Sequence, residues 1–133
     1  MTYRVVQWST GNVGRHAIAG IAAHPDLELV GVWVSSPAKV GIDAGKLAGL
    51  DHDLGVAATD DAEALLALRP DCIVHTAWAD DRLFEAMADL ERFLRAGIDV
   101  VSSSPVFLQY PMGAVPEGLY RGVVEAAAEG GAS

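Results

Sequence analysis

Short apolar runs rich in β-branched residues alternate along the chain with longer stretches in which apolar positions recur every three or four residues. The short runs are typical of β-strands, and the longer stretches are typical of amphipathic helices. Strands that are separated by crossover helices build parallel sheets. The pattern therefore predicts a doubly wound α/β fold, with strands expected at Tyr3–Trp8, Leu27–Val34, Val56–Thr59, Asp71–Thr76 and Ile98–Ser102.

Helical periodicity fills the segments between these strands. Helices are expected at Val13–Ala23, within 41–50, at Asp61–Leu68 and at Glu117–Glu129, and 105–116 is expected to be a loop. Either Asp60 or Asp61 is placed to cap the helix at 61–68. A further helix follows the fourth strand, with Asp80 or Asp81 as its N-cap and Gly97 at its end. Its core-facing positions are expected to be Leu83, Phe84, Met87, Leu90, Phe93 and Leu94.

The run Asp71–Thr76 is almost continuously apolar, which is typical of a central strand covered on both faces. It contains Cys72, the only cysteine of the chain. One cysteine allows no disulfide framework within the chain, and its apolar neighbours indicate a buried structural thiol.

Composition limits the domain organisation and the partners. The chain has 133 residues, 51% of them hydrophobic, so we expect a single domain over 1–133. The formal net charge of -9 argues against nucleic acid, whose affinity comes largely from basic residues. We find no secretory leader and no apolar run near the roughly 20 residues that a membrane span needs. We therefore expect a cytoplasmic protein without a membrane partner.

The most informative motif follows the first strand directly. Ser9-Thr10-Gly11-Asn12-Val13-Gly14-Arg15 contains the dinucleotide fingerprint G-x-G-x-x-G with serine as its first residue. A side chain at Gly11 would block a pyrophosphate from the backbone, and Gly14 would let the helix pack closely. In this strand-to-helix context the motif predicts a Rossmann-type domain whose pyrophosphate site comprises Ser9, Thr10, Gly11, Asn12, Val13, Gly14 and Arg15.

The end of the second strand indicates which dinucleotide is bound. An acid about 20 residues after the glycines commonly holds the adenosine ribose of NAD. Here Ser35, Ser36 and Lys39 stand there instead. Hydroxyls and a lysine would accept a 2′-phosphate, so we expect NADP, with NAD as the alternative.

Ligands of open parallel sheets lie outside the carboxyl ends of the strands. The later strands end at His75-Thr76-Ala77 and at Ser102-Ser103, which we expect to line the cofactor site. His75 at a strand end is also typical of a structural histidine, so we assign it no catalytic role. We expect no metal site, because no group of histidines and acids has ligand spacing.

The segments Val5–Arg15 and His24–Val32 resemble the N-terminal domain of dihydrodipicolinate reductase-like oxidoreductases, in particular the branch that includes 2,4-diaminopentanoate dehydrogenase. The resemblance covers essentially the whole chain. It implies an NAD(P)-dependent enzyme that moves hydride at a C=N or C–N centre of an amino-acid-like substrate. Such proteins continue into a second, C-terminal substrate domain, which this chain is expected to lack, so no catalytic residue is carried over.

Two alternatives remain at this point. A non-catalytic dinucleotide-binding or regulatory domain would have the same sequence features. An extended short-chain dehydrogenase or epimerase would explain Thr10-Gly11-x-x-Gly14, but its third glycine is Ala17 here and neither lysine follows a suitable tyrosine. Because a short sheet leaves an edge exposed, we also expect self-association.

Overall fold

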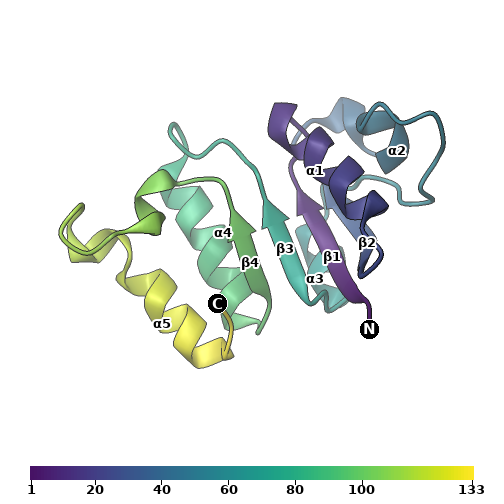
Figure 1. Ribbon diagram of the computed structural model, residues 1–133. Helices are drawn as coiled ribbons and strands as arrows, with labels where there is room; N and C mark the ends of the chain where they lie inside the picture. Colours follow the sequence, from purple (N-terminus) through teal and green to yellow (C-terminus); the bar gives the residue numbers. More distant parts are fainter.

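The computed structural model describes all 133 residues and contains one sheet of four parallel strands (Figure 1). The strands are β1 (Tyr3–Trp8), β2 (Leu27–Trp33), β3 (Cys72–His75) and β4 (Asp99–Ser102), in the order β2-β1-β3-β4. The chain runs from β1 outward to β2 and then returns to the other side of β1. The order therefore reverses between β1 and β3, and this switch point is where open α/β sheets bind ligands. The Rossmann-type α/β fold is confirmed.

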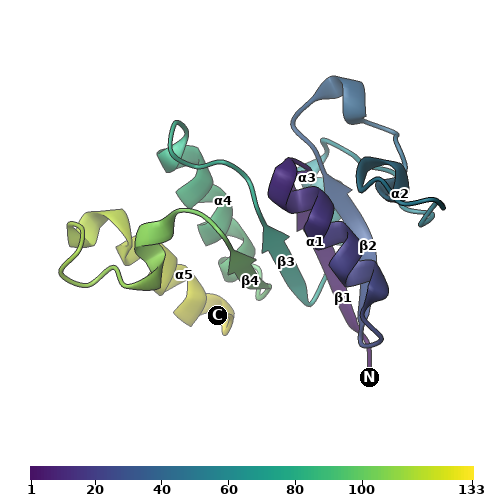
Figure 2. The same ribbon diagram turned by 45° about the horizontal axis from the view of Figure 1, so that its top comes forward.

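Helices cover the two faces unequally. On one face, α1 (Asn12–Ala23) and α2 (Ala44–Leu47) pack on β1 and β2. On the other face lie α3 (Ala62–Ala67) and α4 (Leu83–Arg95), and α5 (Arg121–Gly130) packs beside α4 (Figure 2). Short 3₁₀ turns occupy Pro37–Lys39, Val106–Gln109 and Glu117–Leu119.

Trp8 lies at the centre of the larger core, on the face of α3 and α4. Its ring stacks on Trp33 of β2 with centroids 4.7 Å apart, and it meets Phe93 of α4 edge to face at 4.6 Å. Such aromatic pairs contribute roughly 0.5–1.5 kcal/mol beyond the area they bury. The last residues of β1 and β2 are thereby held against α4, directly below the carboxyl edge of the sheet.

The prediction that the central strand is covered on both faces is wrong. On the α1 side, no helix lies over β3 and β4 (Figure 1). Val101 of β4 is consequently 63% exposed, and Cys72 and Val74 of β3 are only half-buried. Partial burial still raises the pKa of the Cys72 thiol, which keeps it protonated at neutral pH.

Two local predictions also fail. No strand forms at 56–59, where only single bridges join Thr59 to Trp33 and Ala57 to Asp43. The segment changes partner along its length: the Asp43 carboxylate accepts the N–H groups of Leu54, Gly55, Val56 and Gly45, whereas Ala58 and Thr59 donate to the carbonyls of Ile42 and Val32. These bonds fold the segment into a loop around the start of α2.

The start of α4 differs from its prediction. Neither Asp80 nor Asp81 caps it, because the helix begins one residue later, after Arg82, without a side-chain cap. Phe84 is 78% exposed, whereas the other expected core positions are buried or half-buried. Phe84 lies about 100° around the helix from Leu83, off the stripe of Leu83, Met87, Leu90 and Leu94 that faces the core, so its side chain points to solvent. By contrast, Asp61 caps α3 as predicted, accepting from the Ala64 N–H at 3.1 Å.

The outer edge of β4 borders an apolar groove between β4, α4 and α5. Its lining includes Leu90, Val100, Val106 and Val123. The N–H of Val100 donates to the carbonyl of Ser133 at 2.8 Å, so the last residue of the chain lies along this edge.

Candidate functional site

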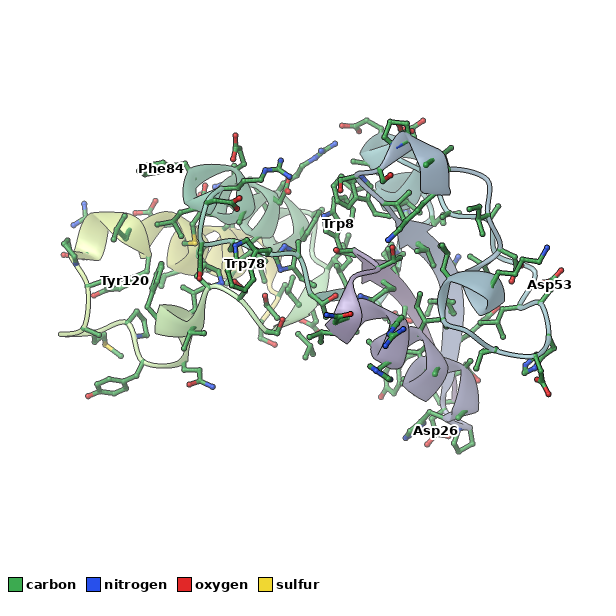
Figure 3. The ribbon with its side chains drawn as sticks, turned by 90° about the horizontal axis from the view of Figure 1, so that it is seen from above. Trp8, Asp26, Asp53, Trp78, Phe84 and Tyr120 are labelled. Atoms are coloured by element: carbon green, nitrogen blue, oxygen red, sulfur yellow. The ribbon has the colours of Figure 1, made fainter.

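The predicted site residues come from four different loops, and the structure gathers these loops at one edge of the sheet. Because the strands are parallel, all four end at this carboxyl edge, onto which Figure 3 looks down. Residues 9–15 follow β1, Ser35 to Lys39 follow β2, 75–77 follow β3, and 102–103 follow β4. The glycine turn lies at the switch point, between the loop after β2 on one side and the loops after β3 and β4 on the other.

The glycine turn presents backbone rather than side chains to solvent. Gly11 is the N-cap of α1, and no side chain caps the first turn of this helix. The first N–H groups of a helix have no partner within it, and they carry the positive end of the helix dipole. A Cβ built on Gly11 meets no atom within 4 Å, so the space beside these donors is open. This arrangement fits an anion such as a pyrophosphate.

Gly14 allows the helix to begin directly against the turn. A Cβ at this position would overlap the carbonyl oxygen of Ser9 and would lie 2.9 Å from Oγ1 of Thr76. Ser9 itself has a φ of 81°, in the left-handed region where glycine is the favoured residue. The serine in place of the first glycine therefore keeps the turn, at the cost of backbone strain.

Two residues brace this turn from the sheet. Gln7 of β1 is fully buried, and its Nε2 donates to the Ser9 carbonyl at 2.9 Å and to Thr76 Oγ1 at 2.8 Å. The Thr76 hydroxyl in turn donates to the Trp8 carbonyl at 3.3 Å. Thr76 was predicted from its place at a strand end, but Gln7 was not, although an amide inside an otherwise apolar strand marks it in the sequence.

The lysine after β2 reaches back to the glycine turn. Lys39 Nζ lies 3.1 Å from Oγ1 and 3.4 Å from the carbonyl of Thr10. Ser36 is the N-cap of the 3₁₀ turn that contains Lys39, and Ser35 is exposed beside it. The structure thus brings a cation beside the glycine turn, with two serines preceding it in the same loop, in a chain whose net charge is strongly negative.

Asn12, Val13 and Arg15 are exposed on the first turn of α1, beside the open space at Gly11. The Arg15 guanidinium forms no ion pair with another side chain. It is therefore free to pair with a ligand phosphate.

His75 and Thr76 point to opposite faces, as successive strand residues do. Thr76 faces the glycine turn, whereas His75 is buried on the α4 side, where Nδ1 lies 2.9 Å from Ser102 Oγ. Burial lowers the pKa of His75, so the ring is neutral near pH 7. Ser103 is exposed and Ala77 half-buried at the same edge. Of these residues only Thr76 contacts the glycine turn, whereas His75 and Ala77 lie on the α4 side and Ser102 and Ser103 line the apolar groove beside β4, α4 and α5. The prediction that the β4 end lines the same site as the glycine turn is therefore not supported by the lining of these surfaces.

No group of three or more histidine, cysteine or acidic side chains is arranged to hold a metal ion. None of the helices is both long enough and apolar enough to cross a membrane.

Known proteins are similar to this chain in both sequence and fold. Residues 5–101 match the family "Dihydrodipicolinate reductase, N-terminus". An amine dehydrogenase of Streptomyces virginiae is 51% identical over 129 residues, which is 96% of this chain and 35% of that protein. The amine dehydrogenase structure from Mycobacterium smegmatis superposes with a TM-score of 0.83 at 32% identity, over 99% of this chain and 38% of that one.

A more distant neighbour shares the fold alone. It is a biliverdin reductase from Synechocystis sp. PCC 6803, solved with biliverdin and NADP⁺, at 21% identity and a TM-score of 0.71 over 98% of this chain and 36% of that one. Nearly all of this chain matches the two amine dehydrogenases, but it spans only 35% and 38% of their lengths.

Proposed function

The chain belongs to the dihydrodipicolinate reductase N-terminal family, and we propose that it is the NADP-preferring cofactor-binding part of an oxidoreductase. Its relatives are oxidoreductases, and its fold is that of the nicotinamide dinucleotide-binding domain of such enzymes. For the whole enzyme we propose hydride transfer at a C=N or C–N centre of an amino-acid-like substrate, in keeping with the amine dehydrogenases among its relatives.

The observation that carries the proposal is the uncapped start of α1 at Gly11. A pyrophosphate here would accept hydrogen bonds from the N–H groups of the first turn, and Arg15 would neutralise part of its charge. The brace from Gln7 and Thr76 holds the turn in place before any ligand arrives. Preorganisation of this kind lowers the entropic cost of binding.

The preference for NADP rests on the loop after β2. Lys39 has no acidic partner and lies beside Thr10, between the glycine turn and the two serines. A ribose 2′-phosphate at this rim would meet one cation and the hydroxyls of Ser35 and Ser36. An acidic residue, which would repel the phosphate and favour NAD, is absent from 34–39. The bound cofactor supplies hydride chemistry, and these residues bind and orient it.

Calorimetric titration of the 133-residue chain with NADPH and with NADH tests the proposal. We expect both to bind, and NADPH to bind more tightly. Lys39→Ala should reduce the preference for NADPH, whereas Lys46→Ala, which changes the only other lysine, should leave it unchanged. Absence of heat with either cofactor at millimolar concentration would refute dinucleotide binding. Equal affinities for the two cofactors would refute only the NADP preference.

A further inference from the structure

Ser9 is the position at which the glycine turn departs from the dinucleotide fingerprint. It stands where the fingerprint has its first glycine, and its φ of 81° lies in the left-handed region. The Cβ of a serine in this region crowds the following carbonyl oxygen, so the conformation persists only where neighbouring groups hold it. The groups that contact Ser9 therefore decide whether the turn keeps its shape.

The side chain of Gln7 provides the main contact of this kind. Val6 and Trp8, its neighbours in β1, point into the core on the α4 side, so Gln7 points to the opposite face. It is fully buried there, and its Nε2 donates to the Ser9 carbonyl at 2.9 Å. No backbone N–H donates to that carbonyl oxygen. Removal of the amide would therefore leave the Ser9 carbonyl without a donor from the protein.

Thr76 fixes the orientation of the Gln7 amide. The Thr76 hydroxyl donates to the Trp8 carbonyl at 3.3 Å, so it acts as the acceptor in its contact with Gln7 Nε2, at 2.8 Å. The Ser9 carbonyl can also only accept. Both contacts thus require the nitrogen of the amide, and they prevent the amide from turning its oxygen toward Ser9.

The oxygen of the same amide has no partner. Gln7 Oε1 is buried, and no hydrogen bond reaches it. A buried acceptor without a donor disfavours the folded state, and an aliphatic side chain of similar length would avoid this penalty. The amide is therefore favourable at this position only through its donor. We propose that Gln7 is a positioning residue, which holds Ser9 in the left-handed conformation and so makes a serine acceptable where the fingerprint has glycine.

The conformation of Ser9 also affects the donors that follow it. The Ser9 carbonyl lies against Gly14 of α1, and Gly11 is the N-cap of that helix. A rotation of this carbonyl would shift the first turn of α1 and its free N–H groups away from the open space beside Gly11. The effect of Gln7 on a ligand rests on the proposed dinucleotide binding, whereas its effect on Ser9 can be measured without a ligand.

A double-mutant cycle of Gln7→Met and Ser9→Gly in the 133-residue chain tests this role. Methionine has a similar length but no donor, and glycine adopts the left-handed region without support. In calorimetric titrations with NADPH, Gln7→Met should raise the Kd about tenfold beside Ser9 but only about twofold in the Ser9→Gly background. Gln109→Met makes the same change at the only other glutamine, and it should leave the Kd unchanged.

Unfolding in guanidinium chloride applies the same cycle without a ligand. Gln7→Met should lower the unfolding midpoint, and it should lower it less in the Ser9→Gly background. A simple packing defect would be equally large in both backgrounds. Thr76→Val frees the amide to turn away from Ser9 and should follow the same pattern, so the test remains decisive if Gln7→Met does not fold.

The outcomes separate this role from the proposed function. If the changes in Kd and in midpoint are equal with Ser9 and with glycine at that position, Gln7 only fills space and the positioning role is wrong, while dinucleotide binding stands. If the wild type binds no dinucleotide, the proposed function is wrong, and the unfolding midpoints alone decide whether Gln7 holds Ser9.

Discussion

Replacing Gly14 with alanine is the sharpest test of how the glycine turn is built. The added Cβ would overlap the carbonyl oxygen of Ser9 and lie within 2.9 Å of Thr76 Oγ1. A backbone oxygen cannot rotate away as a side chain can. Either α1 must shift from the turn, or the brace from Gln7 to Ser9 and Thr76 must break.

The magnitude follows from two opposing terms. Overpacking a well-packed site lowers the free energy of unfolding by about 1–3 kcal/mol, whereas replacing glycine with alanine in a helix raises it by about 1 kcal/mol. Gly20→Ala, in the same helix, provides the matched control, because a Cβ there meets nothing within 4 Å. The helical gain is common to both variants. The difference between them in free energy of unfolding should therefore report the overlap alone, about 1–3 kcal/mol in favour of Gly20→Ala.

Equilibrium unfolding in guanidinium chloride gives this difference, and calorimetry with NADPH gives the effect on the site. We expect Gly20→Ala to retain the wild-type affinity and Gly14→Ala to lose at least about tenfold, because the first-turn N–H groups move. Equal unfolding free energies together with equal affinities in the two variants would refute the close approach of α1 to Ser9.

Three further predictions concern the same edge of the sheet. Gly11→Ala should change the free energy of unfolding by less than about 1 kcal/mol, because the added Cβ meets no protein atom within 4 Å. The same Cβ would occupy the space proposed for the pyrophosphate, so the Kd for NADPH should rise at least about tenfold. Unchanged affinity in calorimetry would contradict this. Ser9→Gly should stabilise the chain by up to about 1 kcal/mol in chemical unfolding by relieving the strain at φ 81°, and a lower unfolding midpoint would show that no strain is stored there. Burial lowers the pKa of His75 from its ordinary 6.5, so the unfolded chain takes up a proton that the folded chain resists. The free energy of unfolding should therefore fall as pH drops below about 6.5, and it should fall less steeply in His75→Asn. Parallel pH profiles of the two proteins would assign the loss of stability to other groups.

Features that depend on neighbouring residues could be predicted well. The alternation of apolar runs predicted all four strands of the sheet, and the Asp61 cap of α3 needed only the chemistry of a helix start. The glycine turn is equally local, since a tight strand-to-helix connection requires small residues at fixed spacing. The location of the candidate site at the carboxyl edge of the sheet was predicted from strand direction alone, because all strands of a parallel sheet end at the same edge.

Features that depend on residues far apart in the chain could not be predicted. The strands β3 and β4 have apolar composition, yet no helix covers them on the α1 side, so Val101 is exposed. The segment 56–59 has strand composition, yet Val56 donates to the Asp43 carboxylate, and Ala58 and Thr59 donate to the carbonyls of Ile42 and Val32. Composition carries no information about which distant elements a segment meets.

The sequence by itself therefore determined the fold class, the glycine turn and the edge at which we propose that a ligand binds, because each of these depends on local periodicity or on strand direction. Only the tertiary structure decided what lies around the turn. It brought Gln7 and Thr76 together beneath Ser9, and it left the α1 side of β3 and β4 uncovered. These outcomes depend on packing between elements that are up to about seventy residues apart, and a linear pattern does not record such packing.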